Sequence, residues 1–186
     1  MSGTALVLAA VALLTLAVLL AHNRFVTLRN RMRSAVADLD VQLRRRADLV
    51  PGLVETVKAH AGHERAVLAE AAAARTAAAA ATPAERSAAE RRVAAGVERL
   101  LALAEAYPRL KADRAFLALQ DELAATENKI AFSRQLVNDT VTSYRDAVQS
   151  FPGVLLARPL GFGPPDFLAV DPAERGLVQV RSQTGG

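Results

Sequence analysis

The sequence predicts an all-α protein: an N-terminal transmembrane helix that continues into an antiparallel, up-down-up-down four-helix bundle, followed by an irregular tail rich in Pro and Gly. Ala, Leu, Arg and Glu dominate while aromatic residues make up only 4%, a composition that favours long helices over sheets. A run of seventeen residues near the N-terminus is almost wholly apolar. Beyond it, apolar residues recur three and four positions apart, the spacing of one helix face.

The apolar run, residues 5–21, reads ALVLAAVALLTLAVLLA, in which Thr15 is the one polar side chain. As a helix it would rise roughly 25 Å, enough to cross a hydrocarbon core. A cleaved signal peptide is the alternative, but residues 1–4 carry no Lys or Arg, and residues 19–22 form a poor cleavage site. We therefore expect residues 1–23 to remain as a membrane anchor.

The placement of arginine predicts how this anchor is oriented. Between His22 and Arg46 there are seven arginines and two aspartates, a net charge of +5 that exceeds the +4 of the whole chain. Basic residues close behind a span stay on the cytoplasmic side of the membrane. We expect the N-terminus outside and the predicted bundle, residues 24–152, in the cytoplasm. The run Arg44–Arg46 is interpreted as a solvated or snorkelling set.

Four bundle helices are expected. No Pro or Gly occurs between Thr4 and Val50, so the span should run directly into the first bundle helix, which Pro51-Gly52 is expected to break. The second helix contains alanine tracts up to residue 81, whose small side chains permit close packing. The segment Thr82-Pro83-Ala84-Glu85 predicts the third helix, with Thr82 as N-cap, Pro83 at the first helical position and Glu85 closing a capping box.

Pro108 is expected to end the third helix, and Asp113 to cap a fourth that runs to Pro152. Apolar residues of the fourth helix keep a near-heptad spacing, typical of a coiled coil. Thr126 and Ser133 interrupt this stripe, where they either fix the register or are simply tolerated in the packing.

The tail, residues 153–186, is expected to be irregular because Pro and Gly punctuate it throughout. An even number of helical passes returns the chain towards the membrane from which the first helix left. We therefore expect four apolar tail residues to rest on the base of the bundle or in the membrane interface: Leu155, Leu156, Phe162 and Phe167.

Several long segments agree, in order, with a known family: residues 25–64, residues 100–141, Ser150-Phe151-Pro152 and Gly161-Phe162. On these residues the chain resembles the LemA family of bacterial membrane proteins, nearly throughout the range 25–167.

The resemblance implies an N-terminal membrane helix and a soluble helical bundle, held at the bacterial cytoplasmic (inner) membrane. Relatives in magnetosome biogenesis imply a role in membrane organisation rather than catalysis. The departures from the family pattern are local: Val36, Val137 and Arg145 stand where Trp, Tyr and Asn are usual.

Catalytic and metal-binding motifs are incomplete in this sequence. His60 and His63 share a helix face beside Glu64, a spacing compatible with metal ligation, but the segment lacks the second His of HExxH, and a surface or capping role is expected. No Glu precedes a His by three positions, which argues against a di-iron carboxylate bundle. No Ser lies in a Gly-x-Ser-x-Gly turn, and residues 161–163 precede prolines rather than a helix. We predict no enzymatic activity, no catalytic, cofactor or metal residues, and no small-molecule substrate.

The basic segments Arg29–Arg33 and Arg44–Arg46, with a calculated pI of about 10.1, suggest nucleic acid as one partner. Retention of positive charge at the cytoplasmic face already accounts for them, and each basic residue gains about 1 kcal/mol near anionic lipid. We therefore expect a lipid bilayer, and no nucleic acid, as partner. The predicted function is a membrane-anchored, non-enzymatic scaffold or adaptor that binds protein partners or self-associates. The alternative is a signal-transducing membrane subunit, for which no kinase, receiver or nucleotide motif is present.

Overall fold

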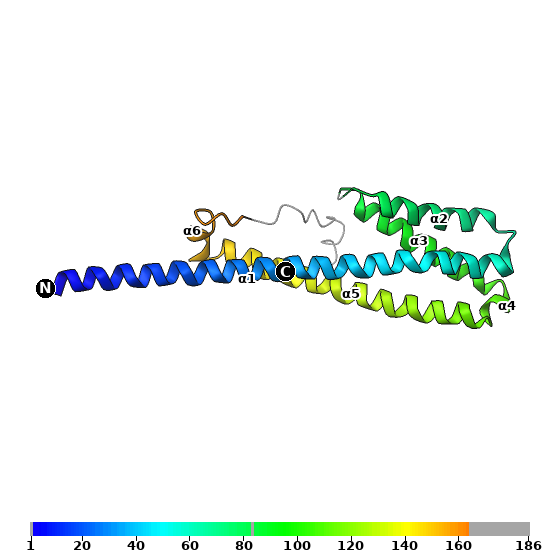
Figure 1. The fold of residues 1–186 in the computed structure, drawn as a ribbon, viewed down its shortest axis with the longest axis horizontal. Helices are drawn as coiled ribbons and strands as arrows, with labels where there is room; N and C mark the ends of the chain where they lie inside the picture. Colours follow the sequence, from blue (N-terminus) through cyan, green and yellow to red (C-terminus); the bar gives the residue numbers. More distant parts are fainter. Residues whose placement is uncertain (1, 83, 164–186) are drawn as a thin grey trace, which may run out of the picture. The chain divides into compact units, whose positions relative to one another are not determined.

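A computed structural model describes residues 2–82 and 84–163 of the chain (Figure 1). Every regular element in these ranges is a helix, which confirms the all-α fold class. The helices are α1 (Ser2–Ala61), α2 (Arg65–Ala80), α3 (Arg86–Glu105), α4 (Pro108–Lys111), α5 (Arg114–Gln149) and α6 (Gly153–Ala157).

The chain divides into two compact units. The first unit comprises Met1–Arg31 and Thr140–Gly186, and the second comprises Met32–Asp139. Helices α1 and α5 each contribute residues to both units. The up-down-up-down arrangement and the division into an anchor (1–23), a bundle (24–152) and a tail (153–186) stay predictions.

Helix α1 continues without interruption past Pro51, so the expected break at Pro51-Gly52 is wrong. Pro51 lies on the exposed side of the helix between the buried residues Val50 and Leu53. The carbonyl freed by the missing proline N–H lies one turn back on that same side, where water can replace the lost donor. Burial of the flanking side chains then holds the helix together across the defect. The helix ends instead at Ala61, before the turn that contains Gly62.

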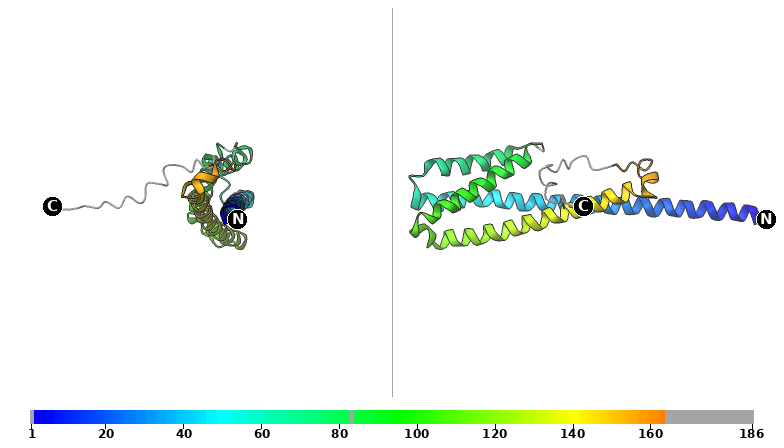
Figure 2. Two further views of the ribbon diagram at one scale, coloured as in Figure 1. Left: turned by 90° about the vertical axis from the view of Figure 1, so that its left-hand side faces the viewer. Right: turned by 180° about the vertical axis from the view of Figure 1, so that it is seen from behind.

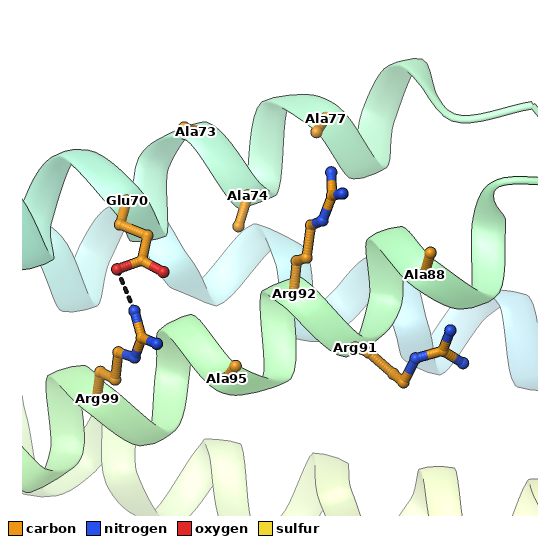
Figure 3. Close-up of a pocket in the computed structure, with 9 residues that line it drawn as sticks. All are labelled: Glu70, Ala73, Ala74, Ala77, Ala88, Arg91, Arg92, Ala95 and Arg99. Atoms are coloured by element: carbon orange, nitrogen blue, oxygen red, sulfur yellow. Dashed lines mark hydrogen bonds and ion pairs between the residues drawn. The ribbon is translucent and has the colours of Figure 1, made fainter.

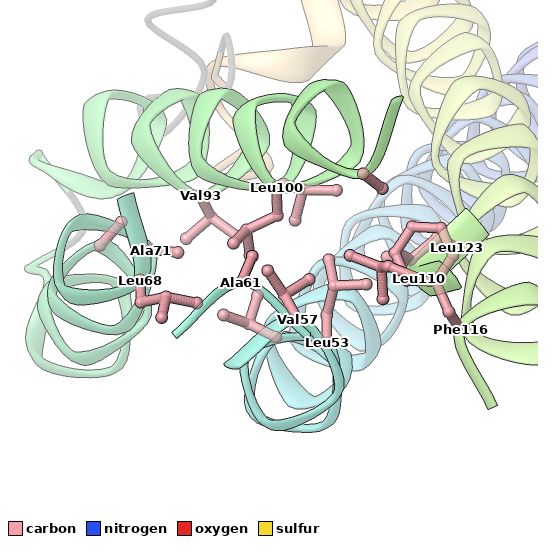
Figure 4. Packing of buried hydrophobic residues seen from close by; sticks show 14 residues of the cluster. Leu53, Val57, Ala61, Leu68, Ala71, Val93, Leu100, Leu110, Phe116 and Leu123 are labelled. Atoms are coloured by element: carbon pink, nitrogen blue, oxygen red, sulfur yellow. The ribbon is translucent and has the colours of Figure 1, made fainter. Parts of the chain in front are cut away.

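The core of the second unit is formed by apolar side chains of α1, α2, α3, α4 and α5 that meet between the helices (Figure 4). From α1, Leu53 and Val57 are fully buried, and Leu100 of α3 and Leu110 of α4 are fully buried with them. Burying one such side chain stabilises a fold by about 1.5–3 kcal/mol. The labelled members in the figure are Leu53, Val57, Ala61, Leu68, Ala71, Val93, Leu100, Leu110, Phe116 and Leu123.

Helices α2 and α3 approach each other closely at Gly96. A Cβ atom added at Gly96 would lie 3.3 Å from the Ala71 Cα and 3.5 Å from the Ala71 Cβ. The expected role of small residues in close packing thus holds at this crossing of the alanine-rich helix.

Polar side chains form local hydrogen bonds before α3 and at the start of α5. The Thr82 backbone N–H and hydroxyl both donate to Glu85 Oε2, at 3.1 and 2.7 Å. The hydroxyl bond, followed by the backbone bond, lowers the pKa of the Glu85 carboxyl below its usual value. The α-helix begins just afterwards, at Arg86, with Glu85 in the N-cap position. The prediction of Thr82 as N-cap is therefore wrong, because its hydroxyl binds the Glu85 carboxylate instead of a backbone N–H of the helix. Pro83 lies outside the described residues. Asp113 Oδ1 accepts from the N–H groups of Ala115 and Phe116 at 2.8 and 3.0 Å, which confirms it as the cap of α5.

The tail begins with a helix rather than irregular chain, since Gly153–Ala157 form α6. After it, the Phe162 N–H donates to the Ala157 carbonyl at 2.8 Å, and the Tyr144 hydroxyl donates to the Gly163 carbonyl at 2.9 Å. Of the four apolar tail residues singled out above, Phe162 is buried, Leu156 is half-buried, Leu155 is exposed, and Phe167 lies outside the described residues.

Candidate functional site

The first part of α1 presents apolar side chains that nothing in the described structure covers. Among the described helices, α1 is the one long and apolar enough to cross a membrane, with a mean hydropathy of 2.7 in its most apolar window and none of that window buried. Leu6 and Leu20 are 71% and 61% exposed. Thr15 donates its hydroxyl to the Val11 carbonyl at 2.9 Å, so the polar group of the run is satisfied within the helix, as a hydrocarbon environment requires.

Arg46 is buried, with only 2% of its surface exposed, so the interpretation of Arg44–Arg46 as a solvated or snorkelling set is wrong for this residue. Its Nη2 donates to Glu90 Oε2 at 2.8 Å and to the Glu90 carbonyl at 3.1 Å. Its Nη1 donates to Glu127 Oε1 at 3.1 Å. We call Arg46, Glu90 and Glu127 the Arg46 cluster. It joins α1, α3 and α5 inside the second unit.

The members of the Arg46 cluster differ in their access to solvent. The Glu90 side chain is 15% exposed and that of Glu127 is 45% exposed. The Arg46–Glu90 pair is therefore largely desolvated, while Glu127 can exchange its partner for water. A guanidinium suits this position because its planar fork reaches two acceptors at once, whereas a lysine ammonium is a point charge on a flexible stem.

The two neighbouring arginines in the sequence behave differently. Arg45 Nη2 lies 2.6 Å from Glu122 Oε1, but both side chains are largely open to solvent, at 53% and 42% exposed. Arg44 is exposed, so the original interpretation fits it. Helical geometry explains why the three arginines differ in exposure. Side chains of consecutive residues point about 100° apart around a helix, so only Arg46 lies on the buried stripe.

The sequence carried a signal for this burial. Arg46 lies three residues after Leu43 and four before Val50, both of which are buried. That spacing places it on the apolar stripe of α1. The partners could not be identified in the same way, because Glu90 and Glu127 lie 44 and 81 residues away along the chain.

A groove of about 590 Å³ runs along α2 and α3 within the second unit (Figure 3). Its floor is built mainly from alanine. In the figure Arg92 extends across it towards α2, and Arg99 forms an ion pair with Glu70. The residues that line this α2–α3 groove are Glu70, Ala73, Ala74, Ala77, Ala88, Arg91, Arg92, Ala95 and Arg99. The lining thus combines small apolar side chains with a net positive charge.

His60 and His63 are both exposed. His60 Nε2 lies 3.9 Å from Asp113 Oδ2, and its Nδ1 lies 3.2 Å from the Thr56 carbonyl. Within residues 2–82 and 84–163, no three His, Cys, Asp or Glu side chains are grouped so that they could hold a metal ion.

Two polar residues that interrupt the stripe of α5 are buried. Thr126 and Ser133 are 1% and 7% exposed. Thr126 donates its hydroxyl to the Glu122 carbonyl at 2.8 Å, within its own helix. A hydroxyl satisfied in this way can be accommodated in the packing without a partner on another helix.

Sequence comparison identifies the family of this chain. The model of the LemA family matches residues 35–181, which is most of the chain. The chain belongs to the LemA family. No curated protein matches it. The LemA match begins inside α1, after the apolar run, and includes both the Arg46 cluster and the α2–α3 groove.

Proposed function

We propose that this LemA-family protein is a single-pass, non-enzymatic membrane scaffold or adaptor. The apolar start of α1 spans the cytoplasmic membrane of the bacterial cell with its N-terminus outside. Residues 24–152 form an antiparallel four-helix bundle in the cytoplasm, where it binds protein partners or a second copy of the chain. The role of this protein is then to hold those partners at the membrane surface.

The observation that carries the proposal is the continuity of α1. The same helix that exposes Leu6 and Leu20 supplies Leu53 and Val57 to the core of the second unit. Exposed apolar side chains of this size are stable in lipid but not in water. A continuous helix, rather than a flexible linker, therefore joins the proposed bundle to its anchor. Such a connection suits a protein that presents a binding surface close to the membrane.

The side of the membrane can be tested directly. The net charge of +5 between His22 and Arg46 supports a cytoplasmic bundle. A reporter enzyme that works only in the cytoplasm, fused after Gly186, should be active. A fused reporter that works only in the periplasm should be silent. Periplasmic activity would reverse the proposed topology.

The non-enzymatic part of the proposal is supported by how the charged groups are used. Arg46 pairs with Glu90 and Glu127, so this buried charge stabilises the fold rather than serving a reaction. The lining of the α2–α3 groove contains alanine, arginine and one glutamate, Glu70, which is paired with Arg99, so the groove provides contact area and positive charge.

The α2–α3 groove is the surface we assign to partner binding. A photo-crosslinking amino acid at Ala77, which lines the groove, should capture a reproducible partner or a second copy in native membranes. The matched control is Ala79, an exposed residue of the same helix that does not line the groove. Crosslinks identified by mass spectrometry should be specific to Ala77. A monomeric product with no partner at either position would contradict scaffolding, and partners that change with a stimulus would favour the signalling alternative.

A further inference from the structure

Three large apolar side chains lie exposed where α5 passes into α6. Phe151 is 81% exposed, Leu155 is 65% exposed and Val154 is 47% exposed. We call these three residues the foot. Each square ångström of apolar surface left in water costs about 25 cal/mol relative to a covered state. Three such side chains within five residues are more than the scattered exposure normal for a soluble surface.

The segment that carries the foot lies against α1 at Gly153, which lies between residues of the foot, and at Phe162, which follows it. Phe162 is buried, and its ring centroid lies 5.3 Å from that of Phe25 and 5.4 Å from that of His22. At the other end, a Cβ added at Gly153 would lie 3.3 Å from Phe25 Cζ. Figures 1 and 2 show α6 beside this part of α1. Both ends of the segment 153–162 therefore meet the same turn of α1.

That turn of α1 lies immediately after the apolar run. Residue 21 ends the run, and Phe25 follows four residues later, a rise of roughly 6 Å along the helix. Apolar side chains that rest on a membrane surface sit about 5–10 Å into the boundary between headgroups and acyl chains. If residue 21 marks the end of the hydrocarbon core, the foot is fixed at the level of that boundary.

Charge at the same level fits an anionic membrane surface. Arg24 lies one residue before Phe25, and Arg158 follows α6 directly, and both are exposed. Basic residues beside interfacial apolar side chains are the arrangement of amphipathic elements that bind anionic lipid. A lipid interface at this level would be continuous with the exposed apolar surface of α1 and would cover the foot without a further partner.

We propose that the foot is a second, interfacial membrane contact, in which Phe151, Val154 and Leu155 insert into the headgroup region beside α1. This inference rests on the proposed function, because it requires α1 to span the bilayer. The inference goes beyond the proposed function because it assigns lipid binding to the residues where α5 passes into α6. The bundle is then attached to the membrane through both α1 and the end of α5.

The chain has no Trp, so a single introduced Trp is a unique fluorescent probe of lipid contact. The full-length variant Leu155→Trp is reconstituted into phosphatidylcholine–phosphatidylglycerol vesicles whose acyl chains carry bromine near the headgroup or near the bilayer centre. Val154→Trp provides a second probe of the foot. Leu13→Trp, inside the apolar run, reports on the span. Phe132→Trp, 71% exposed on α5 in the second unit, is the matched control.

We expect Leu155→Trp and Val154→Trp to lose emission about two-fold in lipid brominated near the headgroup, and less with bromine at the centre, as an interfacial depth requires. Leu13→Trp should be quenched most by central bromine, and Phe132→Trp by neither. Quenching of Leu13→Trp without quenching of either foot probe would refute the foot while leaving the anchor intact. Absence of quenching at Leu13→Trp would instead refute the anchor.

Two further outcomes also count against the foot. Equal quenching of Phe132→Trp would mean that the bundle lies on lipid generally. Blue-shifted but unquenched emission from Leu155→Trp would show that protein, such as a second copy of the chain, covers the corner instead of lipid.

Discussion

Replacing Arg46 by methionine tests whether the Arg46 cluster stabilises the second unit. Arg46→Met keeps a long unbranched side chain but removes the charge and all the donors. Glu90 then keeps a carboxylate that is only 15% exposed and has lost its cation, and the Glu90 carbonyl loses the Nη2 donor 3.1 Å away. The stranded carboxylate, rather than the lost attraction, dominates the expected effect.

The magnitude follows from the exposure of each partner. Breaking a buried ion pair on one side costs about 3–5 kcal/mol. Glu127 is 45% exposed, so water solvates its carboxylate once Arg46 is replaced. The loss of the Arg46–Glu127 pair therefore contributes less than about 1 kcal/mol to the destabilisation. We expect Arg46→Met to lower the free energy of unfolding by about 3–5 kcal/mol, against a typical total of about 5–15 kcal/mol. Adding Glu90→Gln removes the stranded charge and should restore about 1–3 kcal/mol.

The assay is urea unfolding of the full chain in detergent micelles, followed by far-UV circular dichroism. The matched control is Arg45→Met, the same substitution one residue earlier, at a pair whose side chains are 53% and 42% exposed. That control should cost less than about 1 kcal/mol, and its effect should shrink as salt is added, because salt screens exposed pairs more than buried ones.

If Arg46→Met and Arg45→Met lowered the free energy of unfolding by the same small amount, burial of the ion pair would not explain its contribution to stability. Failure of Glu90→Gln to recover any stability in the Arg46→Met background would refute the stranded carboxylate as the cause. In either case the cluster would be a by-product of helix packing rather than one of its supports.

Three more predictions concern backbone packing and pH. Gly153→Ala places a Cβ against the Ala147 carbonyl oxygen, where there is no room for it, so α6 must shift, and chymotrypsin should cleave after the buried Phe162 at least about ten-fold faster; an unchanged rate would contradict the clash. Gly96→Ala should leave stability nearly unchanged, because the higher helix propensity of Ala offsets a tight 3.3 Å contact. Gly96→Val should lower the free energy of unfolding, measured in urea, by about 1–3 kcal/mol; equal effects of the two substitutions would contradict the close approach of α2 and α3. Burial, then the charge of Glu64 and the hydrogen bond to it, raises the pKa of the Tyr107 phenol above its ordinary value of 10.0. The neutral phenol therefore adds stability that is present below pH 10 and is lost as pH rises through the higher folded-state pKa, so Tyr107→Phe should lose less stability than the parent chain on alkaline titration, and parallel losses would contradict this.

The sequence by itself determined the features that depend on neighbours a few positions away. The apolar run identifies a helix able to cross a membrane, and the three-and-four spacing identifies the buried faces of α1, α3 and α5. The Asp113 cap follows from a side chain that reaches N–H groups only two and three residues ahead. Such signals are legible because a helix brings residues three and four apart together whatever the rest of the chain does.

The tertiary structure decided the features that depend on distant segments. Pro51 does not end α1, because burial of the residues beside it outweighs one missing hydrogen bond. Arg46 is buried because two carboxylates far along the chain meet it there, and α6 is placed by the packing of Phe162 on Phe25. The local preference of Pro51 for a helix break, or of Arg46 for solvent, amounts to a few kcal/mol at most. Burial against residues from distant parts of the sequence stabilises the fold by enough to reverse such a preference.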